Sequence, residues 1–194
     1  MGRRSLGLVS ILNIQLTNNL IAMIDLFKNY ELQREELFAR IAQSLQLDVT
    51  RRQRMESAYN AISLLLNDDD DFFKGIEIDV YPQGSVAIGT TCKPLNKNEF
   101  DLDIVIHIRS MYTKHTPEEI YNALYRKLAN DGRYKDKLER KRRCVRINYS
   151  GDFHMDILPG CIIFVYDDKS IKVPDRELKT WVTSGPKGFA EWFL

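Results

Sequence analysis

The sequence predicts an α+β (mixed α/β) domain whose helices pack on one side of a sheet. Helical periodicity covers residues 21–73, apart from a break near residues 45–50, and it returns at residues 116–132. Apolar and polar residues alternate, as in half-buried strands, before this later helical segment and again after it. Helices, two strands, a further helix and a group of strands are typical, in this order, of an α+β domain. The 194 residues suffice for one domain with additional helices.

The helix predicted after the break has one buried face. Its apolar positions recur at spacings of three and four, at Met55, Tyr59, Ile62 and Leu66. Thr50 and Gln53 have the spacing of a capping box, so we expect the helix to begin there. The acidic run at residues 68–71 ends the helix, and it predicts a solvated loop because it lacks the glycine and the distal glutamate of a calcium loop.

Two strands are predicted next, in GIEIDVYP and in FDLDIVIHI. Because side chains alternate between the faces of a strand, the second segment has an apolar face and a mixed face. The apolar face carries Leu102, Ile104, Ile106 and Ile108. The mixed face carries Asp101, Asp103, Val105 and His107. We therefore expect the apolar face to lie in the core.

The segment TPEEIYNALYRKLANDG predicts a helix with clear ends. Thr116 is the expected N-cap, Pro117 takes the first position, Glu119 completes a capping box and Gly132 ends the helix. Strands are predicted in CVRINY, FHMDILPG and CIIFVYD. VPDRELKTWVTSGPKGFAEWFL then predicts a short helix, a Ser-Gly-Pro turn and the start of another helix.

Charge and cysteine content restrict the partners and the compartment. The net charge of +1 gives no overall field that would attract nucleic acid or an anionic membrane. The basic run at residues 135–146 is interpreted as solvated and not as an RNA-binding or effector-binding surface, because Asp136 and Glu139 interrupt it. The three cysteines, which we expect to be reduced, small and buried, are Cys92, Cys144 and Cys161. We expect a cytoplasmic protein.

The N-terminal run SLGLVSIL imitates part of a signal peptide. Asn13 and Gln15 interrupt the apolar pattern, and this favours a helix over a targeting signal. A translation start at Met23 is an alternative reading of the same segment.

Two aspartates in one strand predict a metal site. Asp101 and Asp103 project from the same face of the strand, with roots roughly 6–7 Å apart. Magnesium prefers a couple of carboxylates together with phosphate oxygens and water. If the strand of FHMDILPG pairs beside the first one, Asp156 joins them in a two-metal arrangement. His154 and His107 are interpreted as polar neighbours of these carboxylates.

The tripeptide QGS, residues 83–85, is a candidate phosphate-binding loop. It follows a predicted strand, and glycine lets the backbone approach a ligand closely. The hydroxyl of Ser85 and neighbouring N–H groups can bond to phosphate oxygens. The pair Gly84–Ser85 gains its meaning from the ordered set of aspartates that follows it.

The segments GSVAIGTT, FDLDIV and FHMDILPG, in this order, resemble the DNA polymerase β-like nucleotidyltransferase superfamily. Within it, YPQGSVAIGT, RCVRINYSGDFHMDILPG and WVTSGPKGFAEWF are similar to the bacterial cGAS/DncV-like cyclic-oligonucleotide synthases, or CD-NTases. Members of that family join nucleoside triphosphates into cyclic di- or trinucleotide signals, typically in response to phage infection, and release pyrophosphate. The resemblance therefore implies an ATP- or GTP-binding enzyme of antiviral defence with a polymerase β-like core.

The resemblance also implies roles for three carboxylates. Asp101 and Asp103 would bind two magnesium ions, for which manganese could substitute. Asp156 would be the third catalytic carboxylate and metal ligand, which helps to deprotonate the attacking hydroxyl.

Four further residues would bind the nucleotide. Gly84 and Ser85 would form the triphosphate loop, with Gln83 and Thr90 near the phosphates.

We expect three parts in the chain. Residues 1–73 would form an N-terminal helical segment packed on the core, residues 74–172 the catalytic core, and residues 173–194 the beginning of a helical second lobe that continues past this sequence. An exposed aromatic end at Trp192 and Phe193 predicts self-association. Nucleic acid is expected only as an activator, and no membrane partner is expected.

Two alternatives to a messenger synthase stay open. One is a nucleotidyltransferase that modifies a tRNA, a protein or a small molecule, because the acceptor would be recognised by the second lobe. The other is a truncated protein that binds nucleotide without turnover.

Overall fold

The structure, a computed structural model, describes residues 5–68, 71–94, 99–149 and 153–194, with side chains from Gln15 onward. The chain divides into two compact units, Met1–Gln46 and Leu47–Leu194. Part of the predicted acidic loop, residues 69–70, lies outside the described residues, whereas Asp68 and Asp71 are exposed.

The first unit contains one long helix, α1 (Ser5–Leu45). Its described side chains are exposed, including apolar ones such as Leu20 and Phe27. Within the described residues, no helix combines the length and the apolar content that a membrane span requires. We expected residues 1–73 to form one helical segment packed on the core. For residues 1–46, this stays a prediction.

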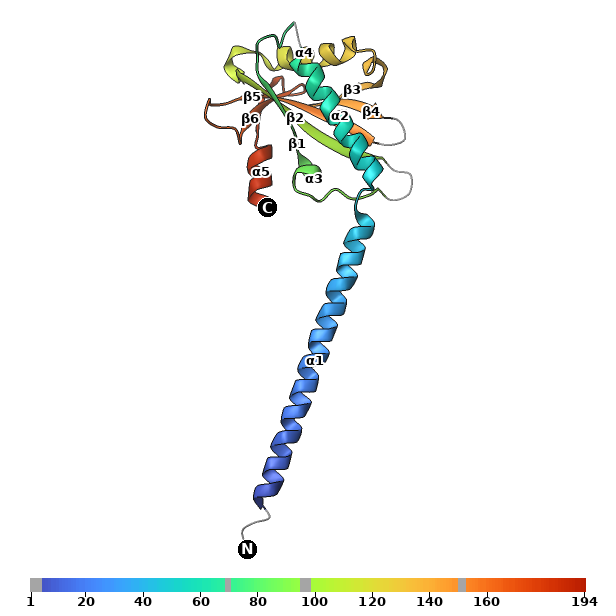
Figure 1. The fold of residues 1–194 in the computed structure, drawn as a ribbon. Helices are drawn as coiled ribbons and strands as arrows, with labels where there is room; N and C mark the ends of the chain where they lie inside the picture. The colour runs from blue at the N-terminus through green and yellow to red at the C-terminus, as the bar shows by residue number, and fades with distance from the viewer. Residues whose placement is uncertain (1–4, 69–70, 95–98, 150–152) are drawn as a thin grey trace. The chain divides into compact units, whose positions relative to one another are not determined.

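In the described part of the second unit, seven strands form one mixed sheet (Figure 1). Its main path runs through β1 (Ile78–Pro82), β2 (Phe100–Met111), β5 (Phe153–Ile162), β4 (Val145–Tyr149) and β3 (Leu138–Arg140). At the far end of β5, the sheet continues into β6 (Ile171–Asp175) and β7 (Thr180–Ser184). β2 and β5 are parallel, and the other neighbouring pairs are antiparallel. The predicted α+β class is confirmed.

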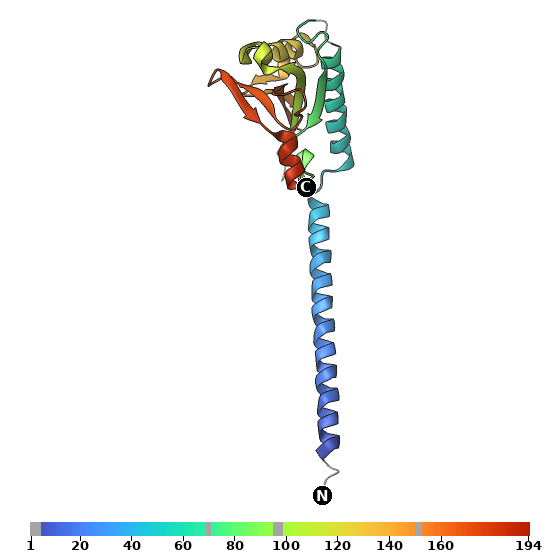
Figure 2. The ribbon, with the colours of Figure 1, turned by 90° about the vertical axis from the view of Figure 1, so that its left-hand side faces the viewer.

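Two helices, α2 (Val49–Asn67) and α4 (Pro117–Asn130), pack on one face of this sheet (Figures 1 and 2). Their core residues are Ala58, Ile62 and Leu66 in α2 and Ile120, Leu124 and Leu128 in α4. The predicted apolar residues of β2, Leu102, Ile104, Ile106 and Ile108, belong to the same core. The predicted capping box of Thr116 and Glu119 is present at the start of α4. One-sided helix packing leaves the opposite face of β2 for other residues.

The predicted start of α2 was wrong by two residues. Asp48, and not Thr50, is the N-cap, because its carboxylate accepts a hydrogen bond from the backbone N–H of Arg51 at 2.8 Å. An aspartate bonds the orphan amides of a first turn at least as well as a threonine does.

The prediction of a strand in CIIFVYD was also wrong. Cys161 and Ile162 are the last residues of β5, which runs through Pro159 and Gly160, and the chain then turns. Phe164 and Val165 are exposed in this turn. The local β-propensity has no neighbouring strand to pair with at this point, so tertiary context overrides it.

The short helix predicted in VPDRELKTW is instead a β-hairpin of β6 and β7. The carboxylate of the fully buried Asp175 accepts bonds from the backbone N–H groups of Glu177 and Leu178, at 3.1 and 3.0 Å. An N-cap aspartate makes the same bonds, which explains the wrong prediction. Lys179 then takes a positive φ of 53° and returns the chain as β7.

Buried Asp175 has two cationic partners on a distant segment. Arg142 Nε lies 2.9 and 2.8 Å from its two oxygens, and Arg143 Nε lies 2.8 Å from Oδ2. The bond from Arg142 holds the pKa of Asp175 well below its usual range. These two arginines of the predicted solvated basic run therefore have a structural partner.

The cysteines only partly meet expectation. Cys161 is buried and Cys144 is half-buried, but Cys92 is exposed. Burial raises the pKa of both the Cys144 and the Cys161 thiol to about 12, which keeps them protonated.

The packing of α2 can be tested with two substitutions on one helix. Ile62 is fully buried, so Ile62→Ala should lower the free energy of unfolding by about 2–5 kcal/mol. Leu64 is 73% exposed, so Leu64→Ala should change it by about 0.5 kcal/mol or less. Urea unfolding monitored by circular dichroism measures both. Equal losses in the two variants would contradict the packing of α2 on the sheet.

Candidate active site

The candidate site lies where β2 and β5 run in parallel. On the helix-covered face, buried residues of the two strands stand opposite each other as Leu102–Met155 and Ile104–Ile157. Side chains at the alternate positions project from the other face. There Asp103 stands opposite Asp156, and Asp101 stands opposite His154. The apolar register thus places three carboxylates on one patch of the sheet.

The predicted phosphate loop lies directly against Asp103. It joins β1 to β2 and contains the short helix α3 (Gly84–Ala87). The backbone N–H of Gln83 donates to the carbonyl oxygen of Asp103 at 2.8 Å. Gly84 has a φ of +60°, and a Cβ added to it would lie 2.9 Å from Asp103 Oδ2. Only glycine combines this backbone conformation with so close an approach to a carboxylate.

The loop is closed by its own hydrogen bonds. The N–H of Thr90 donates to the carbonyl oxygen of Ser85 at 2.8 Å, and the Thr91 hydroxyl lies 3.1 Å from the Ser85 hydroxyl. The predicted residues Gln83, Gly84, Ser85 and Thr90 therefore belong to one compact turn beside the aspartates. Thr91 was missed by sequence reasoning.

An arginine lies among the carboxylates. Arg146 of β4 makes a two-pronged pair with Asp156, with Nε 2.7 Å from Oδ1 and Nη2 2.8 Å from Oδ2. Its Nη2 also lies 3.6 Å from Asp101 Oδ1. Arg146 was assigned to the solvated basic run, and this was wrong. Its alternation with the buried Val145 and Ile147 was the available signal, since it puts Arg146 on the face of Asp156.

Asp103 has the least favourable surroundings of the three carboxylates. Burial raises its pKa, and the negative charges of Asp156 and Asp101 raise it further, while Arg146 opposes this. Two carboxylates opposite each other on neighbouring strands repel when both are ionised. The site therefore favours a cation or a proton between them.

His154 contacts carboxylates, whereas His107 does not. His154 Nε2 lies 3.1 Å from Asp101 Oδ1, and its Nδ1 lies 2.7 Å from Glu99 Oε2. His107 is fully buried next to the Tyr81 ring, and burial lowers its pKa to about 4, so it is neutral at pH 7. Of the two histidines, His154 is the one placed to orient an aspartate.

The donor set suits a hard cation that also binds phosphate. Among the described residues, no three His, Cys, Asp or Glu side chains are arranged as a ready metal cage. Arg146 pairs closely with Asp156 and makes only a longer contact with Asp101, so Asp156 could join Asp101 and Asp103 around an ion only after that close pair opens. Magnesium is commonly held by one or two carboxylates together with substrate phosphates, so these residues fit it.

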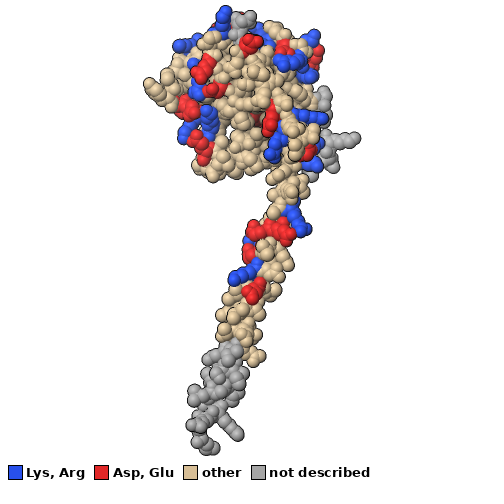
Figure 3. Space-filling model, in the orientation of Figure 1, with Lys and Arg blue, Asp and Glu red and all other residues tan. Residues whose placement is uncertain are grey.

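Charges elsewhere on the second unit are mixed. Figure 3 shows basic and acidic side chains side by side on the visible face, in keeping with the net charge of +1. The local charges of the carboxylate patch, and not an overall field, therefore determine what binds there.

The mixed sheet and the Gly-Ser loop beside aspartates of neighbouring strands are those of a polymerase β-like nucleotidyltransferase. Residues 32–194 match the Second Messenger Oligonucleotide or Dinucleotide Synthetase (SMODS) domain, and the chain belongs to this family. The predicted resemblance is confirmed.

Curated relatives make cyclic dinucleotides. The chain is 47% identical to the c-di-GMP synthase of Roseivirga ehrenbergii over 166 residues. This match covers 86% of this chain and 44% of that protein. The chain is 29% identical over 127 residues to the cyclic dinucleotide synthase CdnG of Bradyrhizobium diazoefficiens, covering 65% of this chain and 30% of that protein. The chain thus spans less than half the length of these relatives.

Solved structures show the same fold. The B. diazoefficiens CD-NTase CdnG in complex with GTP superposes with a TM-score of 0.66 at 25% identity, over 79% of this chain and 44% of that chain. The Vibrio cholerae DncV cyclic AMP-GMP synthase superposes with a TM-score of 0.52 at 21% identity, over 69% of this chain and 40% of that chain.

The raised pKa of Asp103 predicts a gain in stability when its charge is removed. An acid with a raised pKa in the folded state destabilises that state once it is ionised. Asp103→Asn should therefore raise the thermal midpoint at pH 7 by about 2–4 °C. The gain should vanish below about pH 4, the ordinary pKa of an unfolded aspartate, where both states are protonated. Differential scanning calorimetry at pH 7 and pH 3.5 measures this, with exposed Asp136→Asn as the control. A lowered midpoint at pH 7 would contradict the assignment.

Proposed function

We propose that the carboxylate patch is the active site of a magnesium-dependent nucleotidyltransferase that makes a cyclic or linear oligonucleotide messenger. One observation carries the proposal: Gly84 holds its loop against Asp103, while Asp103 stands opposite Asp156 on a parallel strand. This brings the candidate phosphate-binding loop and three carboxylates together at one sheet face.

The reaction is the transfer of a nucleotidyl group between two triphosphates. A ribose hydroxyl of one nucleotide attacks the α-phosphorus of the other, a new P–O bond forms, and the bond to pyrophosphate breaks. Two magnesium ions, or manganese ions, held by Asp101, Asp103 and Asp156 would activate the hydroxyl and neutralise the leaving pyrophosphate.

The residues of the chain then have separate tasks. The backbone and hydroxyl of Gly84 and Ser85 hold the triphosphate, with Gln83 and Thr90 supporting the turn. Asp156 accepts the proton of the attacking hydroxyl, for which its carboxylate must be released from Arg146. A released Arg146 keeps a positive charge beside the negatively charged substrate.

His154 is a positioning residue in this scheme. Its Nε2 lies 3.1 Å from Asp101 Oδ1, and this contact limits the rotation of an aspartate side chain that is 61% exposed. A carboxylate held in one orientation binds an ion with less loss of entropy than a freely rotating one.

The relatives support guanine nucleotides as substrates. One is named as a c-di-GMP synthase, and another was solved in complex with GTP. GTP is therefore the first substrate to test. The proposal includes the predicted cytoplasmic location and role in defence against phage, and its alternatives are transfer to another acceptor and binding without turnover.

The proposal is tested by incubating the protein with labelled GTP and ATP in magnesium. A product and pyrophosphate should form, and Asp103→Asn should lower the rate by about three powers of ten or more, because charge stabilisation at the transferred group is lost. Asp136→Asn removes an exposed carboxylate elsewhere and should leave the rate unchanged. Mass spectrometry of the product separates a cyclic or linear messenger from transfer to another acceptor. Full activity of Asp103→Asn would refute the metal-site assignment.

Alanine variants of two glycines in the loop region distinguish the effect of close approach to Asp103 from the effect of backbone strain. Gly84 and Gly89 both have positive φ, but an added Cβ has open space at Gly89 and meets Asp103 at Gly84. Both alanine variants should lose about 1–2 kcal/mol of stability from the left-handed backbone. Only Gly84→Ala should also weaken binding of a fluorescent GTP analogue in magnesium, by about tenfold or more. Equal affinities of the two variants would mean that the loop does not bind triphosphate.

A further inference from the structure

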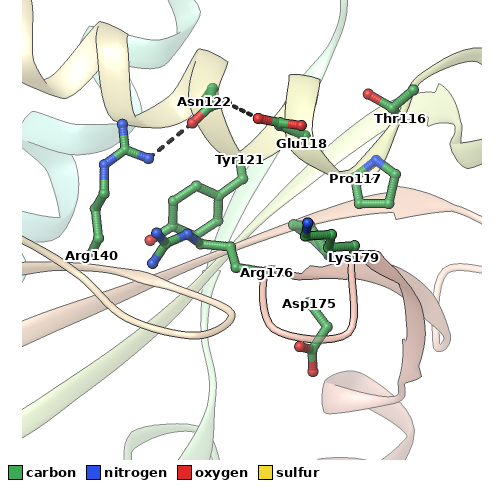
Figure 4. Close-up of a pocket in the computed structure, with 10 residues that line it drawn as sticks. Thr116, Pro117, Glu118, Tyr121, Asn122, Arg140, Asp175, Arg176 and Lys179 are labelled. Atoms are coloured by element: carbon green, nitrogen blue, oxygen red, sulfur yellow. Dashed lines mark hydrogen bonds between the residues drawn. The ribbon is translucent and has the colours of Figure 1, made fainter.

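A cavity lies beside α4, on the face of the sheet opposite to the carboxylate patch. Its volume is about 550 Å³, and it is bounded by the first turn of α4, by β3 and by the turn between β6 and β7 (Figure 4). α4 packs on the sheet face opposite to Asp103 and begins after the far end of β2. Across the sheet, Arg140 of β3 stands three strands from Ile104, the residue after Asp103, and strands lie about 4.8 Å apart, so the two sites are roughly 14 Å apart and on opposite faces. The proposed catalytic chemistry does not use this cavity.

Positive charge predominates in the cavity. Arg140, Arg176 and Lys179 line it together with one exposed carboxylate, Glu118 (Figure 4). Asp175 also lines it, but Arg142 and Arg143 already neutralise this carboxylate. The cavity therefore presents an excess of cationic side chains in a protein whose net charge is only +1.

The two guanidinium groups are held in place by aromatic rings. Arg140 lies 3.6 Å from the centroid of the Tyr125 ring and donates to Asn122 Oδ1 at 2.9 Å. Arg176 lies 5.0 Å from the centroid of the Tyr121 ring and donates to a backbone carbonyl oxygen at 3.2 Å. Each of these two bonds uses one of the five N–H donors of an arginine, so further donors remain for a ligand.

The wall behind the arginines is held by hydrogen bonds. Tyr121 is buried, and its hydroxyl bonds to the carbonyl oxygens of Lys141 and Cys144, at 3.0 and 2.9 Å. The turn that carries Arg176 and Lys179 is fixed by the buried Asp175. A binding site whose cations are positioned before the ligand arrives loses little conformational entropy on binding.

We propose that this cavity binds a small molecule that carries phosphate groups. The planar fork of an arginine matches phosphate oxygens, and two such forks with a lysine can surround a multiply charged group. The volume lies in the range of sites for small molecules and is sufficient for a mononucleotide. The site is distinct from the triphosphate loop, so its ligand is an additional one.

The test titrates inorganic pyrophosphate and AMP separately into the 194-residue protein by isothermal calorimetry, with chelator to remove divalent metal ions. Saturable binding is expected, and the double variant Arg176→Gln/Lys179→Asn should weaken it about tenfold or more. Asparagine is chosen because it tolerates the positive φ at position 179. Lys135→Met, an exposed lysine outside the cavity, and Gly84→Ala, in the triphosphate loop, should leave the affinity unchanged.

A gain-of-affinity variant makes the test independent of folding losses. Glu118→Gln removes the single exposed carboxylate of the cavity and should tighten binding about two- to threefold. Tighter binding of AMP than of pyrophosphate would assign a nucleotide, and the reverse would assign the phosphate groups alone; both support the site. No saturable binding, or an affinity that responds to Gly84→Ala and not to Glu118→Gln and the double variant, would overturn the proposal.

Discussion

The parallel pairing of β2 and β5 is the constraint on which the site depends. Burial of Leu102, Ile104 and their partners on β5 fixes the register, because a slip by one residue would turn apolar side chains outward and carboxylates into the core. That register places Asp103 opposite Asp156. The loop with Gly84 is then located by its bond to the backbone of Asp103. Core packing on one face of the sheet thus determines the chemistry of the other face.

The same register creates an electrostatic conflict. Asp101 and Asp156 are both close enough to Asp103 to disfavour its ionised form. Arg146 relieves the conflict at Asp156 and partly at Asp101. An arginine in this position holds two of the carboxylates together, and its bonds would have to rearrange in the proposed mechanism, in which Asp156 accepts a proton. The clustering of carboxylates is therefore expected to cost some stability, and such a cost is common where a site serves function.

Much of the fold could be predicted from the sequence, because the periodicities are strong. Period-two alternation in FDLDIVIHI predicted both the core face and the carboxylate face of β2, and the capping box at Thr116 predicted the start of α4. The site loop and its aspartates were predicted from their order along the chain, aided by resemblance to a known family. These roles remain proposals.

What could not be predicted depends on contacts between distant segments. The DREL sequence after Pro174 has the form of a helix start, but β6 and β7 pair around it, and buried Asp175 meets Arg142 and Arg143 from a distant segment. Arg146 was interpreted as one of a run of solvated basic residues along the chain, whereas its partner Asp156 lies on the adjacent strand. The basic cavity is formed by three segments that the sequence separates, so no local pattern indicates it.

A crystal structure of the protein with a nonhydrolysable GTP analogue and manganese, whose anomalous signal locates the ion, would test the proposed metal and triphosphate site. The proposed site predicts manganese between Asp101 and Asp103, the triphosphate on the backbone of Gly84 and Ser85, and a broken Arg146–Asp156 pair. A triphosphate bound elsewhere, with no anomalous peak at Asp101 and Asp103, would contradict it.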